Sequence, residues 1–464
     1  MDNSINRTDN LKPILIFLST LALSVLLFFI ENLSGIAFVF PAISISLLLT
    51  YVIVKVPKYW IYSIIITSPL YLISNEADFD ISDLISAIIW IGGLFIWLFY
   101  YVLVQKNKII DDLSDWLFLF FYICLSINFF AAYFNGNELD IWIRTVARFC
   151  IPLLYFPIKA HIKTKIDLRN LLILSTIAFG ILALMMLYET SIRLQNIKHA
   201  WEMGSILRLN QSLFGVALIV IISMIIFNKK IKNKLLLVLS FIPFIIVFIT
   251  SMSRIFWFGL IVSVIYSIFF LPQKQRKTIL ISVLIIFSMA VLIGYALLGE
   301  KADFFLGLFV DRFTSIGNFM EDESFLVRFQ EYGVAFTEIM KSPFIGNGFA
   351  HKIMYYSKLT SDTWHTSNVH NGYILITMRF GIPLAIIYYS VFAYKFFKTI
   401  NILHSAKYSF EKMVLLGVSS GFILLFISNL LSASVMTRDG DFLIALMFGI
   451  IGITTRLIKE DVHG

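Results

Sequence analysis

The sequence predicts an all-α polytopic membrane protein, and three observations support this fold class. Of its 464 residues, 59% are apolar and 14% are charged, whereas soluble domains average roughly 45–50% apolar and 25% charged residues. The apolar residues gather in runs close to the roughly 20 residues that a helix needs to cross a bilayer. The charged residues gather between those runs. Soluble, disordered, fibrous and disulfide-scaffold classes are therefore excluded, and the two cysteines, Cys124 and Cys150, lie inside apolar runs.

Fourteen apolar runs have the length of a membrane span. The first, residues 13–31, follows a weakly basic start without a small-residue cleavage site, so we expect a retained span rather than a signal peptide. No Gly/Ser-rich or Pro-rich linker divides the chain, which favours one integral membrane domain over residues 1–464. The predicted spans are 13–31, 34–54, 59–74, 84–104, 115–134, 141–158, 170–188, 206–228, 235–250, 254–272, 278–298, 372–394, 413–431 and 441–455.

One long hydrophilic interruption, residues 300–370, separates the eleventh span from the twelfth. Its first part, residues 303–320, mixes aromatic and charged residues as a helix lying on a membrane surface does. A second helix is predicted from Ser324 and ends before Pro343. The loop is therefore expected to be helical and to cover an outward cavity. Aromatic and aliphatic residues recur along one face of the second helix at Phe325, Phe329, Tyr332, Phe336 and Ile339.

The net charge of +8 arises from 37 Lys and Arg against 29 Asp and Glu, and it is better explained by membrane orientation than by nucleic-acid binding. When alternate loops are assigned to one side, that side holds 23 of the 37 positive residues, of which 19 are lysines. The excess marks this side as cytoplasmic. Both termini are then inside, and the 300–370 loop is outside.

The positive residues outside or in the membrane are mainly arginines, nine against five lysines. Orientation needs only charge, but the planar guanidinium binds phosphate with two hydrogen bonds and stays charged when desolvated. The surplus therefore favours an extracytoplasmic site for a phosphate-bearing ligand; aromatic stacking and structural pairing are the alternative. The nine are Arg144, Arg148, Arg193, Arg208, Arg254, Arg312, Arg328, Arg379 and Arg438.

Several of these arginines occupy distinctive positions. Arg144 and Arg148 are four residues apart and share one helix face. Arg208 lies in the first turn of a span, and Arg254 lies in a turn between two spans. Arg379 is about seven residues, or roughly 10 Å, inside its span, a depth at which a charge usually faces a protein cavity. Each could be a snorkelling anchor alone, but together they could bind a diphosphate.

Three of the seven histidines, His351, His365 and His370, fall within twenty residues at the end of the long loop. Histidine is the side chain best suited to take a proton from a hydroxyl near neutral pH. Their spacing matches no standard zinc motif, so no metal site is predicted. The alternative is a hydrogen-bonded structural histidine at the membrane boundary.

Five short blocks, in this order, resemble the bacterial O-antigen ligase/polymerase superfamily. They are Ser253-Arg254, Arg328, Lys341–Phe349, His370–Tyr373 and Arg379–Pro383. The blocks cover residues 253–383, and the long outer loop before the last few spans also fits this superfamily.

The resemblance implies a fold like that of C-type membrane glycosyltransferases, acting at the outer face of the bacterial inner membrane on glycans carried by undecaprenyl diphosphate. It implies His370 as the general base on the acceptor hydroxyl, and Arg254, Arg328 and Arg208 as diphosphate ligands. The donor carbon is already activated by its leaving group, so transfer needs no metal or cofactor and is expected to invert the anomeric configuration. Supporting roles fall to Asn371, Arg379, Asp441, Arg144 and Arg148.

Within this superfamily, a polymerase of O-antigen or another surface polysaccharide is the favoured function. A ligase that transfers the glycan to lipid A core is the alternative, and the fourteen predicted spans exceed the number usual in such ligases. A protein O-oligosaccharyltransferase would differ only in its acceptor. A lipid-linked oligosaccharide flippase is a further alternative, although we find no internal repeat of the kind transporters show. The expected partners are the lipid-linked donor, a glycan or lipid A core acceptor, membrane lipids and a chain-length regulator protein.

Overall fold

The computed structural model describes most of the chain. The described residues are 46–73, 86–195, 210–227, 231–251, 253–273, 275–277, 323–357 and 362–463, with single positions at 281, 288, 292, 307 and 310. The predicted span 13–31, the start of span 34–54 and Arg208 lie outside the described residues, as do all but these single positions of the predicted span 278–298 and the predicted surface helix 303–320.

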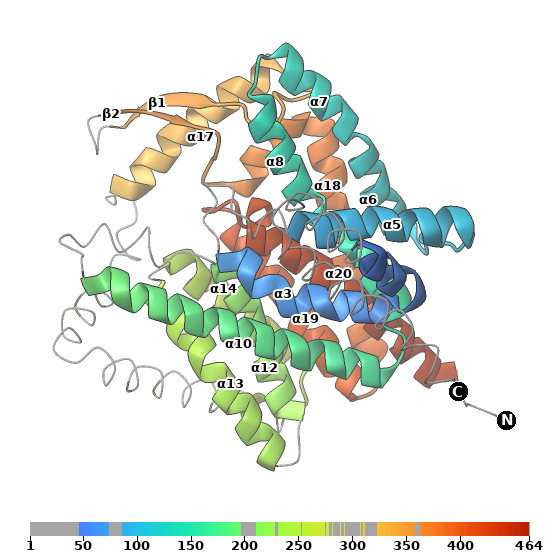
Figure 1. Cartoon of the computed structure of the whole chain (residues 1–464). Helices are drawn as coiled ribbons and strands as arrows, with labels where there is room; N and C mark the ends of the chain where they lie inside the picture. Colours follow the sequence, from blue (N-terminus) through green and yellow to red (C-terminus); the bar gives the residue numbers. More distant parts are fainter. Residues whose placement is uncertain are drawn as a thin grey trace, which may run out of the picture.

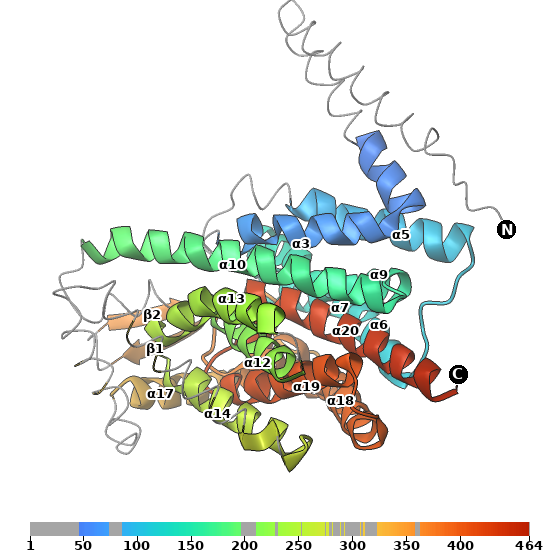
Figure 2. The same cartoon turned by 90° about the horizontal axis from the view of Figure 1, so that it is seen from below.

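The described chain is a layered helical bundle with one β-hairpin (Figure 1). In the view of Figure 2, α3 and α10 form one layer, α14 and α18 lie on the opposite side, and α20 runs between them. A helix over Ser46–Lys55 precedes α3 at a bend of 120°. The elements are α3 (Pro57–Ile73), η2 (Ala87–Gly92), α5 (Gly93–Leu98), η3 (Phe99–Val104), α6 (Leu113–Ile123), α7 (Leu125–Phe134), α8 (Leu139–Phe149), η4 (Ile151–Leu154), α9 (Tyr155–His161), α10 (Lys165–Gln195), α12 (Gln211–Phe227), α13 (Ile231–Thr250), α14 (Arg254–Phe269), α17 (Glu323–Lys341), β1 (Ile353–Ser357), β2 (Asp362–Thr366), α18 (Gly372–Ser405), α19 (Phe410–Ser428), η7 (Ser434–Met436) and α20 (Arg438–His463).

Among the described residues, seven helices are long and apolar enough to cross a membrane, or eight if the bent pair before Ile73 is one span. Three shorter apolar helices, α12, α13 and α14, also coincide with predicted spans. The helical membrane fold class is therefore confirmed, while the count of fourteen spans stays a prediction. One boundary was predicted too short: α18 continues to Ser405, beyond the expected end at residue 394.

Close contact between α12 and α19 forms the centre of the bundle. A Cβ atom on Gly215 would lie 2.7 Å from Leu424, and one on Gly417 would lie 2.8 Å from the backbone of Val220. In lipid, small residues allow helices to approach and gain van der Waals contact. In the most apolar stretch of the neighbouring α20, 89% of the residues are buried. The helices α12, α19 and α20 therefore form the inner scaffold of the bundle.

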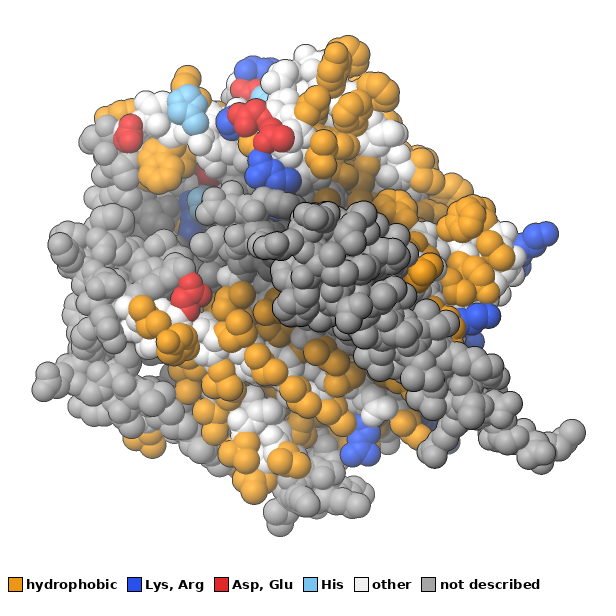
Figure 3. Space-filling view, viewed as in Figure 1, with side chains coloured by type: hydrophobic (Ala, Val, Ile, Leu, Met, Phe, Trp, Pro, Cys, Tyr) orange, Lys and Arg blue, Asp and Glu red, His pale blue; other side chains and the backbone are white. Residues whose placement is uncertain are grey.

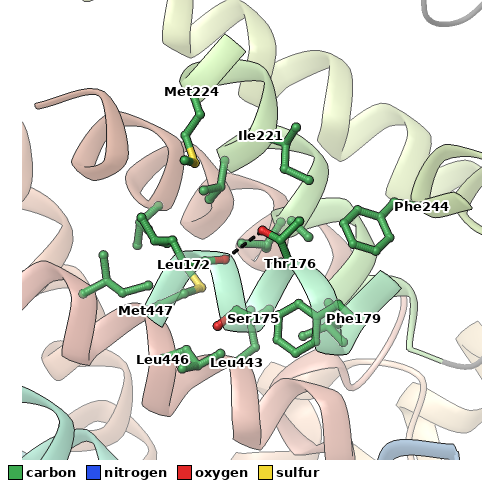
Figure 4. A pocket seen from close by; sticks show the side chains of 16 residues that line it. Leu172, Ser175, Thr176, Phe179, Ile221, Met224, Phe244, Leu443, Leu446 and Met447 are labelled. Carbon is green, nitrogen blue, oxygen red and sulfur yellow. Dashed lines mark hydrogen bonds between the residues drawn. The ribbon is translucent and has the colours of Figure 1, made fainter. Parts of the chain in front are cut away.

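A partly open apolar pocket with a cavity volume of about 50 Å³ lies between the helices α10, α12, α13, α19 and α20 (Figure 4). Two of the lining residues, Ser175 and Thr176, carry hydroxyl groups. The Thr176 hydroxyl donates to the Leu172 carbonyl of its own helix at 2.8 Å. The remaining lining side chains are aliphatic, aromatic or methionine. The cavity therefore offers no charged group for a reaction.

The β-hairpin corrects the expectation that the long loop is entirely helical. Strands β1 and β2 pair antiparallel, with Tyr355 opposite Trp364. Tyrosine, tryptophan and threonine favour strands because they pack well on a pleated surface. The helix predicted from Ser324 is confirmed as α17.

The two long faces of α17 differ in their surroundings. Glu331, Ala335 and Ile339 are buried against the bundle, whereas Phe329 and Phe336 are 52% and 60% exposed. Of the apolar face predicted from the sequence, Ile339 therefore packs inward, whereas Phe329 and Phe336 point outward. On the side seen in Figure 3, hydrophobic side chains cover α10 and α13, while acidic, basic and histidine side chains gather near α17 and α8.

Candidate functional site

His370 lies two residues before α18 and is held by a carboxylate of α17. Its main-chain N–H donates to Glu331 Oε2 at 2.9 Å. Its ring Nδ1 lies 3.0 Å from Oε2 and 3.2 Å from Oε1 of the same carboxylate. The His370 side chain is 57% exposed, whereas that of Glu331 is 1% exposed. The buried Glu331 carboxylate therefore holds the Nδ1 edge of the imidazole, while much of the ring is exposed.

This geometry determines which ring nitrogen can act as a base. A carboxylate accepts hydrogen bonds, so the contact places the imidazole proton on Nδ1 and leaves a lone pair on Nε2 of His370. The buried carboxylate of Glu331 is in turn satisfied by the main chain and ring of His370. A histidine oriented by a carboxylate in this way is a suitable general base.

Sequence reasoning did not identify Glu331, although the sequence held a signal for it. Glu331 lies on the same helical face as Ala335 and Ile339, four and eight residues later. An acidic residue on the apolar, inward face of a helix needs a partner, and a partner 39 residues away in sequence is visible only in the fold.

Tyr332 and Asn371 hold the main chain around His370. The Tyr332 hydroxyl donates to the His370 carbonyl at 2.7 Å and also lies 3.3 Å from the Leu430 carbonyl. Asn371 Oδ1 accepts the Ile374 N–H at 3.0 Å, which caps the first turn of α18. Asn371 Nδ2 donates to the Leu430 carbonyl at 3.0 Å. Asn371, predicted to support substrate binding, therefore has a clear structural role as a helix cap.

The next residue, Gly372, packs against the end of α19. Its N–H lies 2.9 Å from the Asn429 carbonyl and 3.1 Å from that of Ser432. A Cβ atom on Gly372 would lie 1.9 Å from Asn429 Oδ1, so only glycine fits. Buried Asn429 also donates to the Tyr389 hydroxyl at 3.2 Å. The start of α18 is therefore fixed from the 429–432 segment.

Arg379 lies inside the bundle and holds the segment before His370. Its Nη2 donates to the Ser367 carbonyl at 2.9 Å and to Asn368 Oδ1 at 3.2 Å. Its guanidinium carbon lies 5.4 Å from the centre of the Phe349 ring, within cation–π range. Arg379 is 3% exposed. The cavity-facing charge expected at this depth is instead directed at the protein's own loop.

Two of the sequence blocks, Lys341–Phe349 and Arg379–Pro383, fit together at a break in α18. The break occurs at Gly381, whose φ of 78° is easily adopted only by glycine. Main-chain N–H groups of the first block donate to the Met378 and Arg379 carbonyls at 2.8 and 3.1 Å. The Ile382 N–H donates back to the first block at 2.7 Å. The loop thus satisfies backbone groups that the broken helix leaves without helical partners.

Arg328 lies on α17, one turn before Glu331 and Tyr332. Burial raises the pKa of Tyr332 to about 12; the Arg328 charge opposes this rise, and the Glu331 carboxylate adds to it. Arg328 is half-buried. It therefore lies near the Glu331 end of the His370–Glu331 pair, and its role in a common site stays a prediction.

Arg254 is the half-buried first residue of α14. This helix packs against α19 with Gly259 near Leu424 and Ser267 bonded to Ser420, so the two helices run antiparallel. Arg254 precedes Gly259 by five residues, and α19 ends at Ser428, four residues after Leu424. Arg254 is therefore beside the end of α19. It therefore lies at the same end of the bundle as the Leu430 carbonyl that Tyr332 and Asn371 contact.

The remaining predicted site residues make ion pairs involving α8. Arg144 bonds Asp140 of its own helix at 2.6 Å, and both side chains are exposed. Arg148 Nε lies 3.9 Å from Asp441 Oδ2, which links α8 to the first turn of α20. The Asp441 side chain is buried.

The other two loop histidines have different environments. His351 Nε2 lies 3.2 Å from Glu338, a residue of α17 two turns after Glu331. Glu338 also bonds Lys341 at 2.6 Å. His365 is exposed on β2. Within the part of the chain that the structure describes, no three His, Cys, Asp or Glu side chains are grouped so that they could hold a metal ion.

Comparison with known proteins supports the resemblance stated above. Residues 239–389 match the family model described as O-antigen ligase, and this segment contains all five resembling blocks. No curated protein shows significant similarity to the chain. The matched segment is about a third of the chain, and the apolar helices on both sides of it and within it indicate a multi-pass membrane protein.

Proposed function

We propose that the chain transfers a glycan from undecaprenyl diphosphate to a sugar hydroxyl, a function that the match of residues 239–389 to the O-antigen ligase family model supports. The observation that carries this proposal is the His370–Glu331 pair. It presents an exposed imidazole whose Nδ1 is held by a buried carboxylate, so that Nε2 faces away from that carboxylate.

In the proposed reaction, His370 Nε2 removes the proton from the acceptor hydroxyl. The hydroxyl oxygen attacks the anomeric carbon of the donor, forming the new glycosidic bond as the bond to the diphosphate breaks. The leaving group is undecaprenyl diphosphate, and attack from the opposite face inverts the anomeric configuration. Glu331 stabilises the imidazolium that forms, as the carboxylate of a catalytic triad does.

Arginines supply the electrostatic part of the proposal. Arg328, one turn from Glu331, and Arg254, at the first residue of α14, are assigned to the donor diphosphate. Fixed positive groups stabilise the charge that grows on the leaving group, and a guanidinium can do so with two hydrogen bonds. We assign Arg208 to the same group on the basis of the family resemblance. This scheme requires no metal.

The first test is glycan transfer by purified protein in vesicles that contain the lipid-linked donor. His370→Ala is expected to abolish transfer while donor binding is largely retained, because the donor is held by arginines. Full transfer by this variant would remove His370 from the mechanism. A product that retains the configuration of the donor linkage would exclude direct displacement.

A second test separates the polymerase, which we favour, from the ligase. In a deletion strain, single repeat units on lipid A core indicate that a polymerase has been lost. Long polymer left on undecaprenyl diphosphate indicates instead that a ligase has been lost. The accumulation of donor that has not crossed the membrane would support the flippase and contradict both enzymes.

A further inference from the structure

The helix α18 folds back on itself, so that its first residue meets its middle. The Tyr389 hydroxyl donates to the Gly372 carbonyl at 3.0 Å, although the two residues are 17 positions apart in the chain. In a straight helix this separation corresponds to roughly 25 Å. The reversal occurs at Gly381, where a left-handed φ of 78° interrupts the helix. The helix α18 therefore has a short arm, residues 372–380, and a long arm, residues 382–405.

Three hydrogen bonds form a closed ring that joins the short arm, the long arm and the end of α19. The Gly372 N–H donates to the Asn429 carbonyl at 2.9 Å. Asn429 Nδ2 donates to the Tyr389 hydroxyl at 3.2 Å, and this hydroxyl donates to the Gly372 carbonyl. Both main-chain groups of Gly372, two residues after His370, are thus held by residues from other parts of the bundle.

Aromatic packing supports the same junction independently of the Tyr389 hydroxyl. Tyr373, the second residue of the short arm, has its ring centre 4.8 Å from that of Tyr389. The Tyr373 hydroxyl donates to the Phe426 carbonyl of α19 at 3.0 Å. Phenylalanine at position 389 would keep the ring contact and lose only the two hydrogen bonds. The contribution of the hydroxyl can therefore be measured without removing the packing around it.

The main chain at His370 is fixed from two directions. Glu331 accepts the His370 N–H, and Tyr332 donates to the His370 carbonyl, so α17 holds one side. Tyr389 holds the other side through Gly372. A general base must lie within hydrogen-bond reach of the proton that it removes, and a misplacement of about 1 Å can cost roughly 10²-fold in rate. The position of the short arm should therefore affect the efficiency of the base.

We propose that Tyr389 is a positioning residue for His370. Its hydroxyl fixes the short arm of α18 against the long arm, which sets the place of the imidazole relative to Glu331 and the acceptor hydroxyl. Tyr389 acts through Gly372 and takes no part in proton transfer. This inference rests on the proposed function, because His370 needs precise placement as a base only if the protein catalyses glycan transfer.

The kinetic test is Tyr389→Phe in the vesicle assay. We expect kcat to fall about tenfold, while the donor KM and the acceptor KM change less than about twofold. The matched control is Tyr388→Phe: Tyr388 is 1% exposed, and within the part of the chain that the structure describes its hydroxyl makes no hydrogen bond. An unchanged kcat in Tyr389→Phe, a rise in either KM without a fall in kcat, or an equal fall of kcat in Tyr388→Phe overturns the assignment.

Amide hydrogen exchange of the purified protein in detergent separates this inference from the proposed reaction. Tyr389→Phe is expected to speed exchange about tenfold over residues 370–375, where loss of one hydrogen bond loosens the short arm. Exchange in α10 and α20 should not change, and Tyr388→Phe should resemble the unmodified protein. Faster exchange confined to this segment supports the role of Tyr389 even if transfer is never observed. Unchanged exchange there, or an equal increase in all helices, overturns it.

The two measurements also distinguish failure of the inference from failure of the proposed function. Faster local exchange in Tyr389→Phe, together with no glycan transfer by the unmodified protein, contradicts the proposed function and supports the junction. Normal transfer by the unmodified protein, together with normal kcat and normal local exchange in Tyr389→Phe, contradicts the inference and supports the proposed function.

Discussion

Two sites in this molecule place a buried carboxylate against basic side chains, and the two sites differ in how exposed those basic side chains are. Asp115 and Glu331 are both 0% exposed. At Asp115 the basic partners Lys159 and Lys395 are also buried, with side chains 10% and 5% exposed. At Glu331 the partner His370 is 57% exposed. Burial of the whole group gives a structural link, whereas burial of the acid alone leaves a base that can meet a substrate.

The Asp115 group joins three helices. Lys159 of α9 lies 2.5 Å from Asp115 Oδ2, and Lys395 of α18 lies 3.2 Å from Oδ1. The Tyr155 hydroxyl bonds the same carboxylate and accepts from Lys395 at 3.0 Å. The sequence assigns both lysines to the cytoplasmic charge excess, but here they hold α6, α9 and α18 together.

The largest effect is expected at the site with the exposed base. Glu331→Gln cannot favour the same imidazole tautomer, so kcat should fall by about 10³-fold, with little change in thermal stability or donor binding. The matched control is Glu338→Gln, which removes the equivalent partner of His351 two turns along α17. A similar loss of kcat in both variants would show that α17 needs its acids for folding rather than for catalysis.

The site with buried bases should respond in stability instead. Asp115→Ala leaves the buried Lys395 ammonium without its carboxylate, while Lys159 keeps Asp111 at 2.8 Å, and should cost about 3–5 kcal/mol of unfolding free energy. The protein that remains folded should keep its kcat. Denaturant unfolding in detergent, followed by activity per folded molecule, checks both parts. A stable but inactive Asp115→Ala protein would contradict the distinction between the two sites.

A smaller effect is expected for Arg379→Lys. A single ammonium group cannot reproduce the planar contact with Phe349 and the two bonds to Ser367 and Asn368. Loosening of the His370 segment should lower kcat about tenfold and leave the donor KM unchanged. A rise in donor KM without a loss of kcat would instead assign Arg379 to the diphosphate.

Arg254→Lys tests the opposite assignment. If the guanidinium binds the diphosphate with two hydrogen bonds, replacing it by an ammonium should raise the donor KM about tenfold. The acceptor KM should not change. Normal kinetics in this variant would show that charge alone is sufficient at the start of α14.

No change is expected when a chelator is added. The proposed transfer relies on arginines for the leaving group, so the rate in excess chelator should equal the rate in divalent cations. Loss of transfer that is restored by one added metal would overturn this part of the mechanism.

Much of the fold and part of the site follow from the sequence alone. In lipid, a backbone can satisfy its hydrogen bonds only within a helix or a closed barrel, so the long apolar runs predict helices. The described helices fall on the predicted runs, and α17 begins within one residue of its predicted start. His370 and Arg379 were recognised as unusual because each is polar beside or inside an apolar span.

The roles of those residues required the tertiary structure. Glu331 and His370 are 39 residues apart, Arg379 reaches back to Ser367, and Tyr332 meets Leu430 across 98 residues. A linear pattern reports which face of a helix is apolar, but not which distant group a buried charge will meet. That pairing depends on how helices cross and where they break, as α18 does at Gly381. Sequence therefore determined which residues are out of place in a membrane, and packing decided which of them became links and which became a site.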